Sequence, residues 1–278
     1  MDIALVLLMI GVGIFAATYG SLVGSAGGFV IVPILLLLSP ESSPVLLTAI
    51  SLMGIFMVGL SGSWAYHRLG LIDYRSALAF AVPGMLGAIL GVGIVHQISP
   101  SAFRIVLGIM LVLSGASLLR RPSHNVYSRR RRGVSHRYIE DRQGGVYEYR
   151  FNLPLGLVAN FGIGILAALF GIGGGLIFTP FAVTVLGFPI LVAVATSVFT
   201  LLFTVSAAVL THIAMGTFTE ESLRFLPVVF GMAVGGQIGP RIARRAGGIF
   251  VARLLAATLM VIGVWMAISQ SFLAPPPG

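Results

Sequence analysis

Long apolar runs separated by short polar segments make up most of this 278-residue chain. An apolar run of about 20 residues is long enough to cross a lipid bilayer as a helix. Runs of that length lie near residues 3–23, 44–66, 76–96, 102–119, 153–170, 190–212, 222–240 and 249–269. Two shorter apolar runs, 29–39 and 176–188, each follow a cluster of glycines. The pattern predicts an all-α, polytopic membrane protein with about eight to ten transmembrane segments.

The second glycine cluster, GIGGGLIFTP at 171–180, is incompatible with a regular helix. Relative to Ala, each Gly inside a helix costs about 1 kcal/mol and each Pro about 3 kcal/mol. Thr179 followed by Pro180 is typical of an N-cap and a first helical position, so we expect the short helix to begin there. Pro33 predicts a similar start in the first half of the chain. The unwound backbone before each start is expected to be buried in protein or to line a wet cavity.

The same features recur at an offset of 147 residues, where Gly24–Pro33 falls on Gly171–Pro180. With gaps of one or two residues, the match also pairs Ser51 with Ser197, His67 with His212, Gly87 with Gly235 and Gly91 with Gly239. Internal repeats of this kind are common in transporters. We therefore expect two inverted repeats, at 1–119 and 151–270, joined by a loop at 120–150 and followed by a tail at 271–278.

Arginine placement predicts how the chain is oriented in the membrane. All basic residues are Arg, and fifteen of the seventeen lie in three segments, 68–75, 120–150 and 241–253. Cytoplasmic loops are enriched in positive charge, so we expect these segments on the cytoplasmic side of a prokaryotic inner membrane. His67 then lies inside and its repeat partner His212 outside, which predicts that the two repeats run in opposite directions. Both chain termini are expected on the outer side.

Composition narrows the function classes. The formal net charge of +9 could suggest nucleic acid binding, but the arginines follow the loops of a membrane protein, so we predict contact with the lipid bilayer and no nucleic acid. The chain has no cysteine, and its eight acidic residues lie near the N-terminus, in loops or at helix ends. These features predict no metal, no cofactor and no catalytic residue, and therefore no enzyme. Asp2 and the lack of a basic N-terminal region favour a retained first helix. The sequence leaves a homo-oligomer open.

The glycine breaks are the candidate binding site for a small anionic substrate. A helix start offers free N–H groups and the positive end of the helix dipole, which attract anions. The expected backbone and hydroxyl ligands are Gly27, Gly28, Ser51, Gly173, Gly174, Gly175, Thr196 and Ser197, with Pro33, Thr179 and Pro180 fixing the helix starts. His67 and His212 are candidates for proton-linked residues. For the pairs Gly20/Gly24, Gly87/Gly91 and Gly235/Gly239, the four-residue spacing favours close helix packing instead.

These motifs resemble those of a known transporter family. The paired glycine-rich segments that end in Pro33 and Pro180, the Ala-Thr-Ser stretch at 195–197, His212 with Gly216, and the basic central loop are similar to the TauE/SafE sulfite-exporter family of membrane permeases. The similarity runs from about Gly13 to Gly263. It implies transport of sulfite, sulfonates or related sulfur oxyanions, and we expect an exporter of sulfite or an organosulfonate.

Three other functions were weighed against this one. A permease or channel for another solute or ion is the main alternative, although a cation site usually has a carboxylate nearby and the apolar runs lack one. A membrane-embedded enzyme would need paired carboxylates, a metal cluster or an activated nucleophile, and no such motif occurs. A structural scaffold explains the glycine breaks least, because they weaken a helix.

Overall fold

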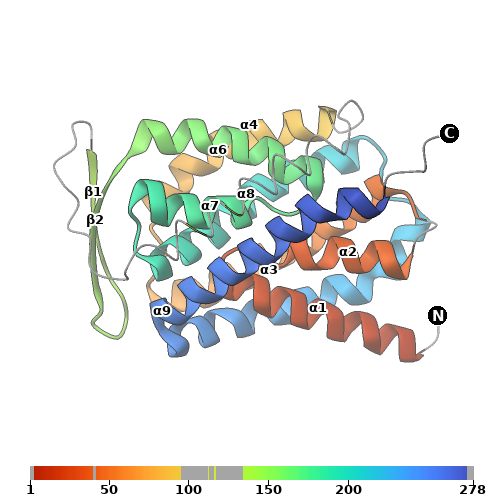
Figure 1. Ribbon diagram of the computed structural model, residues 1–278, viewed down its shortest axis with the longest axis horizontal. Coiled ribbons are helices and arrows are strands. Elements are labelled where there is room, and N and C mark those ends of the chain that lie inside the picture. The colour runs from red at the N-terminus through yellow and green to blue at the C-terminus, as the bar shows by residue number, and fades with distance from the viewer. Residues whose placement is uncertain (1–2, 40–41, 95–111, 113–115, 117–133, 274–278) are drawn as a thin grey trace.

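The computed structural model in Figure 1 describes residues 3–39, 42–94, 112, 116 and 134–273. Its elements in chain order are α1 (Ile3–Val23), α2 (Gly28–Leu38), α3 (Pro44–Leu69), α4 (Tyr74–Ile94), β1 (Val134–Glu140), β2 (Val146–Asn152), α6 (Leu153–Phe170), α7 (Gly175–Phe181), a π-helix η1 (Ala182–Leu186), α8 (Ile190–Ala214), a 3₁₀ helix η2 (Glu220–Phe225) and α9 (Leu226–Leu273). The helix predicted at 102–119 lies outside the described residues except for 112 and 116.

Within the described part of the chain, six helical segments are long and apolar enough to cross a membrane. The last of them, Glu220–Val261, includes most of α9, whose helical geometry is interrupted at Gly247, where φ is 81° and ψ is 163°. Figure 1 shows α9 folding back at this point, so its two arms run in opposite directions. The arms match the runs predicted at 222–240 and 249–269. The prediction of an all-α, polytopic membrane protein is confirmed.

Glycines allow two pairs of helices to touch backbone to backbone. In the α4–α6 pair, a Cβ built on Gly87 would overlap the Phe161 carbonyl oxygen, and one on Gly91 would lie 2.5 Å from that of Ile165. In the pair formed by α1 and the first arm of α9, a Cβ on Gly239 would lie 2.5 Å from the Thr18 carbonyl oxygen. Small residues are what such close approach between membrane helices requires, so the predicted packing role of these glycines is confirmed.

The two helix pairs are related by the offset found in the sequence. Gly235 contacts the Ile14 carbonyl oxygen, and Gly87 contacts that of Phe161. The two contacted residues, Ile14 and Phe161, are 147 positions apart. Thr18 and Ile165, which face Gly239 and Gly91, differ by the same number. Two contacts thus recur with matching partners in both halves of the chain.

Helices α3 and α8 cross the middle of the bundle in opposite directions. Close contacts join Gly59 to Leu202 and Gly62 to Val198, so residue numbers rise along one helix as they fall along the other. Most of α8 is buried, including residues from Leu191 to Val209. The centre of the protein is therefore formed by α3 and α8, each of which comes after a glycine cluster and its short helix.

A two-stranded hairpin covers one end of the bundle, opposite the end where α1 begins and α9 finishes (Figure 1). Strands β1 and β2 pair antiparallel, with Val134 opposite Asn152 and Glu140 opposite Val146. The sequence analysis treated residues 120–150 only as a polar loop and did not predict this hairpin.

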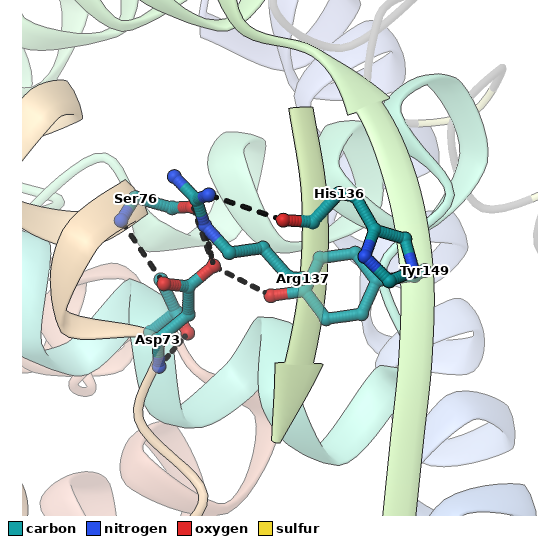
Figure 2. Close-up of polar contacts among 6 residues, drawn as sticks. Asp73, Ser76, His136, Arg137 and Tyr149 are labelled. Carbon is teal, nitrogen blue, oxygen red and sulfur yellow. Dashed lines mark hydrogen bonds and ion pairs between the residues drawn. The ribbon is translucent and has the colours of Figure 1, made fainter. Parts of the chain in front are cut away.

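The hairpin docks on the first half of the bundle through the buried carboxylate of Asp73, which precedes α4 (Figure 2). Tyr149 Oη donates a hydrogen bond to Asp73 Oδ2 over 2.7 Å, and Arg137 Nε lies 3.3 Å from the same oxygen. On its own side, Asp73 accepts a 3.0 Å hydrogen bond from Ser76 N at the start of α4. One carboxylate therefore caps a membrane helix and binds both strands.

A second ion pair ties the hairpin turn to the other half. Arg244, in the first arm of α9, lies 2.8 Å from the buried carboxylate of Asp141. Burial alone raises the pKa of a carboxyl group, but amide hydrogen bonds from Gly145 and Gln143 and the Arg244 guanidinium hold the pKa of Asp141 below its usual value. Asp141 is therefore charged near neutral pH and needs a partner.

We expect Arg244→Gln to loosen the hairpin, because a buried carboxylate that loses a charged hydrogen bond is destabilised by about 2 kcal/mol. Hydrogen exchange of the amides at 134–152 should become faster by roughly tenfold or more. Arg245→Gln is the matched control, because Arg245 is the exposed neighbour on the same helix. Equal exchange in both variants would contradict the docking role of Arg244.

The absence of cysteine allows a direct test of orientation. We expect Ser135→Cys in β1 to be labelled by an impermeant maleimide only from the cytoplasmic side, and Ile3→Cys at the start of α1 only from the opposite side. The arginine distribution and the position of the hairpin motivate this expectation. Labelling of residue 135 from the periplasmic side would show that the orientation is reversed.

Candidate functional site

Two short non-helical segments interrupt the bundle, one between α1 and α2 and one between α6 and α7. Helix α1 ends at Val23 and α2 begins at Gly28, while α6 ends at Phe170 and α7 begins at Gly175. The last residue before each short helix, Gly27 or Gly174, has a left-handed backbone, with φ of 89° and 67°. Only glycine adopts this conformation without steric cost. The chain can therefore turn sharply within a few residues.

The two segments lie against each other. A Cβ built on Gly28 would lie 2.7 Å from the Gly171 carbonyl oxygen. A Cβ on Gly175 would overlap the Gly24 carbonyl oxygen and lie 2.9 Å from Ser25 Cα. We call this contact, formed by residues 24–28 and 171–175, the glycine crossing.

Each half of the chain satisfies a carbonyl group of the other half at the glycine crossing. Ser51 Oγ, from α3, donates a 2.8 Å hydrogen bond to Gly171 O, and Ser197 Oγ, from α8, donates a 2.8 Å bond to Gly24 O. All four residues are buried. The sequence repeat pairs Ser51 with Ser197 and Gly24 with Gly171, so the two bonds are equivalent and reciprocal. The serine protons are consequently engaged by the backbone.

A small cavity lies beside the glycine crossing, between α6, α7 and α8. Its lining residues are Asn160, Ile163, Gly164, Gly174, Phe178, Ser197, Thr200, Leu201 and Thr204. None of these residues is charged, and in this conformation the cavity has room for roughly one water molecule. Its polar wall comes from one amide and three hydroxyl groups.

Three of the four polar side chains of the cavity are already satisfied within their own helices. Asn160 Nδ2 donates to Gly156 O over 2.8 Å, and Thr200 Oγ1 donates to Thr196 O over 2.9 Å. Thr204 Oγ1 makes the same kind of bond to Thr200 O, at 3.3 Å. A hydroxyl can rotate away from its helix carbonyl, so these groups can also bind a solute.

An aromatic cluster separates the cavity from the hairpin. Phe178 of the cavity wall lies with its ring centroid 5.7 Å from that of Phe80 in α4. Phe80 contacts Phe151 of β2 at 5.9 Å, and Tyr149 of β2 contacts Phe188 at 4.5 Å. All five rings are buried. The hairpin thus packs, through two layers of aromatic side chains, against a wall of the cavity.

Only two of the predicted substrate ligands, Gly174 and Ser197, line the cavity. Gly28, Ser51 and Gly175 belong to the glycine crossing, where they contact the other half. The remaining predicted glycines pack elsewhere in the break: a Cβ on Gly27 would overlap Ala16 O, and one on Gly173 would lie 3.0 Å from Ile55.

Thr196 lies away from the cavity, although it is adjacent to Ser197. Its Oγ1 accepts a 3.1 Å hydrogen bond from the backbone N–H of Asp73, at the hairpin end of the bundle. Consecutive residues of a helix point about 100° apart, and this rotation separates the two hydroxyls.

The predicted helix starts at Pro33 and Pro180 were wrong. Both prolines lie inside helices that begin at Gly28 and Gly175, because the left-handed glycine before each helix already reverses the chain. Pro180 cannot donate a hydrogen bond to the carbonyl four residues back, and the wider η1 turn follows it directly. Thr179 is not an N-cap, because its Oγ1 donates to Gly24 O over 3.3 Å.

Neither candidate proton-linked histidine is near the cavity. His67 Nδ1 lies 2.7 Å from the Tyr74 hydroxyl on the exposed surface at the hairpin end. His212 is buried at the far end of α8, with Nδ1 3.2 Å from Thr217 Oγ1. A role of either residue in proton transport stays a prediction.

The sequence analysis did not place Asn160, Thr200 and Thr204 in the site. A signal was present, because Ser197, Thr200 and Thr204 follow the i, i+3, i+7 spacing of one helix face. Asn160 had no comparable signal, since it lies on α6, before the glycine cluster.

Known proteins similar to this chain are membrane transporters. The family model described as "Sulfite exporter TauE/SafE" matches residues 9–266. The chain is 30% identical over 262 residues to the "Probable membrane transporter protein YunE" of Bacillus subtilis (strain 168), and the match covers 92% of this chain and 95% of that protein. No solved structure matches.

The glycine crossing generates a stability prediction. We expect Gly175→Ala to destabilise the protein by about 1–3 kcal/mol, because the added methyl group forces two backbone segments apart. Gly162→Ala in α6 is the control, since a Cβ built there meets nothing within 4 Å and Ala favours a helix. Thermal unfolding in detergent should separate the variants, and equal melting temperatures would contradict the tight contact.

Proposed function

This chain belongs to the sulfite exporter TauE/SafE family and is a membrane transporter rather than an enzyme, and we propose that it carries a small sulfur oxyanion, sulfite or an organosulfonate. The observation that carries the proposal is the uncharged, hydroxyl- and amide-lined cavity beside the glycine crossing. The name of the matching family supports sulfite as the substrate.

The chemistry of the cavity favours an anion over a cation. Asn160 uses one N–H on its own helix and has a second N–H, and the hydroxyls of Thr200 and Thr204 can turn their protons inward. No carboxylate lines the cavity, although cation sites inside membranes usually include one. A site without a cationic side chain binds an anion weakly, which allows release as well as entry. A permease for another small solute or ion is the alternative function.

The cavity is at mid-depth of the helices that line it. Thr200 and Thr204 lie near the middle of α8, and Gly164 lies near the middle of α6. This position supports a substrate site near the centre of the bilayer. It also places the site next to Gly174 and Ser197, the predicted ligands that line the cavity.

We further propose that the two halves are inverted repeats in an inner membrane of a prokaryotic cell, with the hairpin on the cytoplasmic side. Three observations support this arrangement. The bonds Ser51–Gly171 and Ser197–Gly24 are reciprocal, the glycine contacts of α4 with α6 recur between α9 and α1, and α3 opposes α8. Transporters built in this way alternate access by moving one part against another around a fixed site.

Transport measurements test the substrate. Proteoliposomes should take up labelled sulfite or a small sulfonate, and Thr200→Val should lower this uptake by tenfold or more, because a hydrogen bond to a charged group contributes about 1.5–3 kcal/mol. Thr211→Val is the control, since Thr211 is on the same helix, bonds its own helix carbonyl at 2.8 Å and does not line the cavity. The oxyanion proposal fails if no sulfur oxyanion is transported.

A second measurement tests the driving force. An inside-negative potential favours anion exit by about 2.3 kcal/mol per charge per 100 mV, so we expect efflux to follow an imposed voltage without a proton gradient. His67→Gln and His212→Gln should leave this efflux nearly unchanged, because neither histidine reaches the cavity. Flux that instead tracks the pH gradient and disappears in one of these variants would make that histidine the proton carrier.

A further inference from the structure

Three of the four polar side chains that line the cavity have no polar counterpart among the described residues of the half of the chain that contains α1–α4. The offsets that pair Gly24 with Gly171 and Ser51 with Ser197 are 147 and 146 residues. Applied to Asn160, Thr200 and Thr204, these offsets give Gly13, Gly54 and Val58 as the corresponding residues. These three side chains are thus matched by glycine or by an apolar residue, whereas Ser197 is matched by Ser51, whose hydroxyl bonds Gly171 O.

The side chain of Met232 lies against Gly54, at the position that corresponds to Thr200. Met232 is fully buried in the first arm of α9. A Cβ built on Gly54 would overlap its Sδ atom, and one on Gly13 would lie 3.0 Å from its backbone nitrogen. Met232 therefore contacts both glycines that correspond to the polar residues Asn160 and Thr200.

The residue that corresponds to Met232 in the other half is Gly84, by the 148-residue offset that pairs Gly87 with Gly235. A Cβ built on Gly84 would lie 2.6 Å from Thr204 Oγ1 and 3.6 Å from Thr204 Cγ2. Any side chain at position 84 would displace the Thr204 side chain, which lines the cavity. Glycine at this position keeps the cavity open.

We propose that the transporter has a single solute site, the cavity between α6, α7 and α8, and that Gly84 of α4 is the residue that determines how large a solute it accepts. Met232 closes the equivalent site in the other half. The inference rests on the proposed function, because it takes the cavity as the place where the solute binds. The site selects for compact oxyanions, since the space between Thr204 and α4 is only as large as the side chain that Gly84 lacks.

Cysteine labelling tests the single site without reference to any substrate. In the cysteine-free chain, Thr204→Cys and Val58→Cys place a thiol at equivalent positions of the two halves. In proteoliposomes, a small methanethiosulfonate reagent should modify residue 204 at least about tenfold faster than residue 58, because thiol modification requires access. Equal rates, or faster labelling of residue 58, would overturn the proposal.

The same experiment separates the single site from the identity of the solute. Sulfite should slow the labelling of residue 204 and leave that of residue 58 unchanged. If residue 204 is labelled faster but neither sulfite nor a sulfonate protects it, the oxyanion proposal fails and the single site stands. Adding Gly84→Ala to the Thr204→Cys variant should slow labelling several-fold, and unchanged labelling would contradict the role of Gly84.

Transport by two single variants tests the size role of Gly84. We expect Gly84→Ala to lower sulfite uptake by about tenfold and to affect larger sulfonates more, in protein that remains folded. Met232→Ala, the matched change in the other half, should lower the melting temperature but leave the KM for sulfite within about twofold. An equal effect of the two variants on KM would overturn the proposal. If Gly84→Ala does not fold, the labelling rates of residues 204 and 58 decide.

Discussion

Backbone carbonyl groups freed by broken helices in an apolar interior are the constraint on which the rest of this structure depends. No water is available in a bilayer core to satisfy them, and a buried carbonyl left unpaired costs about 1–3 kcal/mol. The protein solves this by exchange, because Ser51 of one half bonds Gly171 of the other while Ser197 bonds Gly24. Neither break is satisfied without the opposite half, so the short helices, the glycine crossing and the cavity beside it form together.

The cavity is built so that it is stable when empty. Thr200, Thr204 and Asn160 each bond a carbonyl one turn earlier in their own helix, so a dry cavity leaves none of these groups unsatisfied. In the proposed function, a solute at this cavity has to compete with those internal bonds, which keeps its net binding weak. Weak binding suits a transporter, since tight binding at the proposed site would slow release on the other side.

Apolar periodicity and glycine placement predicted the long helices well. Local capping rules failed where contacts between distant parts of the chain determine where a helix begins. The apolar runs predicted α1, α3, α6 and α8 to within a few residues, because lipid requires continuous apolar length. Thr179-Pro180 looked like a helix start, but a left-handed glycine before α7 had already started the helix and Thr179 bonds the other half. The hairpin at 134–152 was missed because its alternation of Tyr and Phe with charged residues is short and follows a run of arginines. The spacing of Ser197, Thr200 and Thr204 marks one face of α8, but that Asn160 of α6 lies across the cavity from this face depends on long-range packing, which no single-helix pattern contains.

The hairpin makes the two ends of the bundle unequal in their resistance to separation. At its own end it joins Asp73 of one half to Arg244 of the other through the buried carboxylates of Asp73 and Asp141. At the opposite end, the described residues include one polar link between the halves, the Ser42–Glu221–Arg224 cluster, where the ion-pair side chains are 37–38% exposed. Exposed ion pairs contribute little, about 0–1 kcal/mol, whereas breaking a buried one is far more costly. Among these described contacts, the ones at the hairpin end therefore resist separation of the halves more strongly than the exposed ion pair at the opposite end.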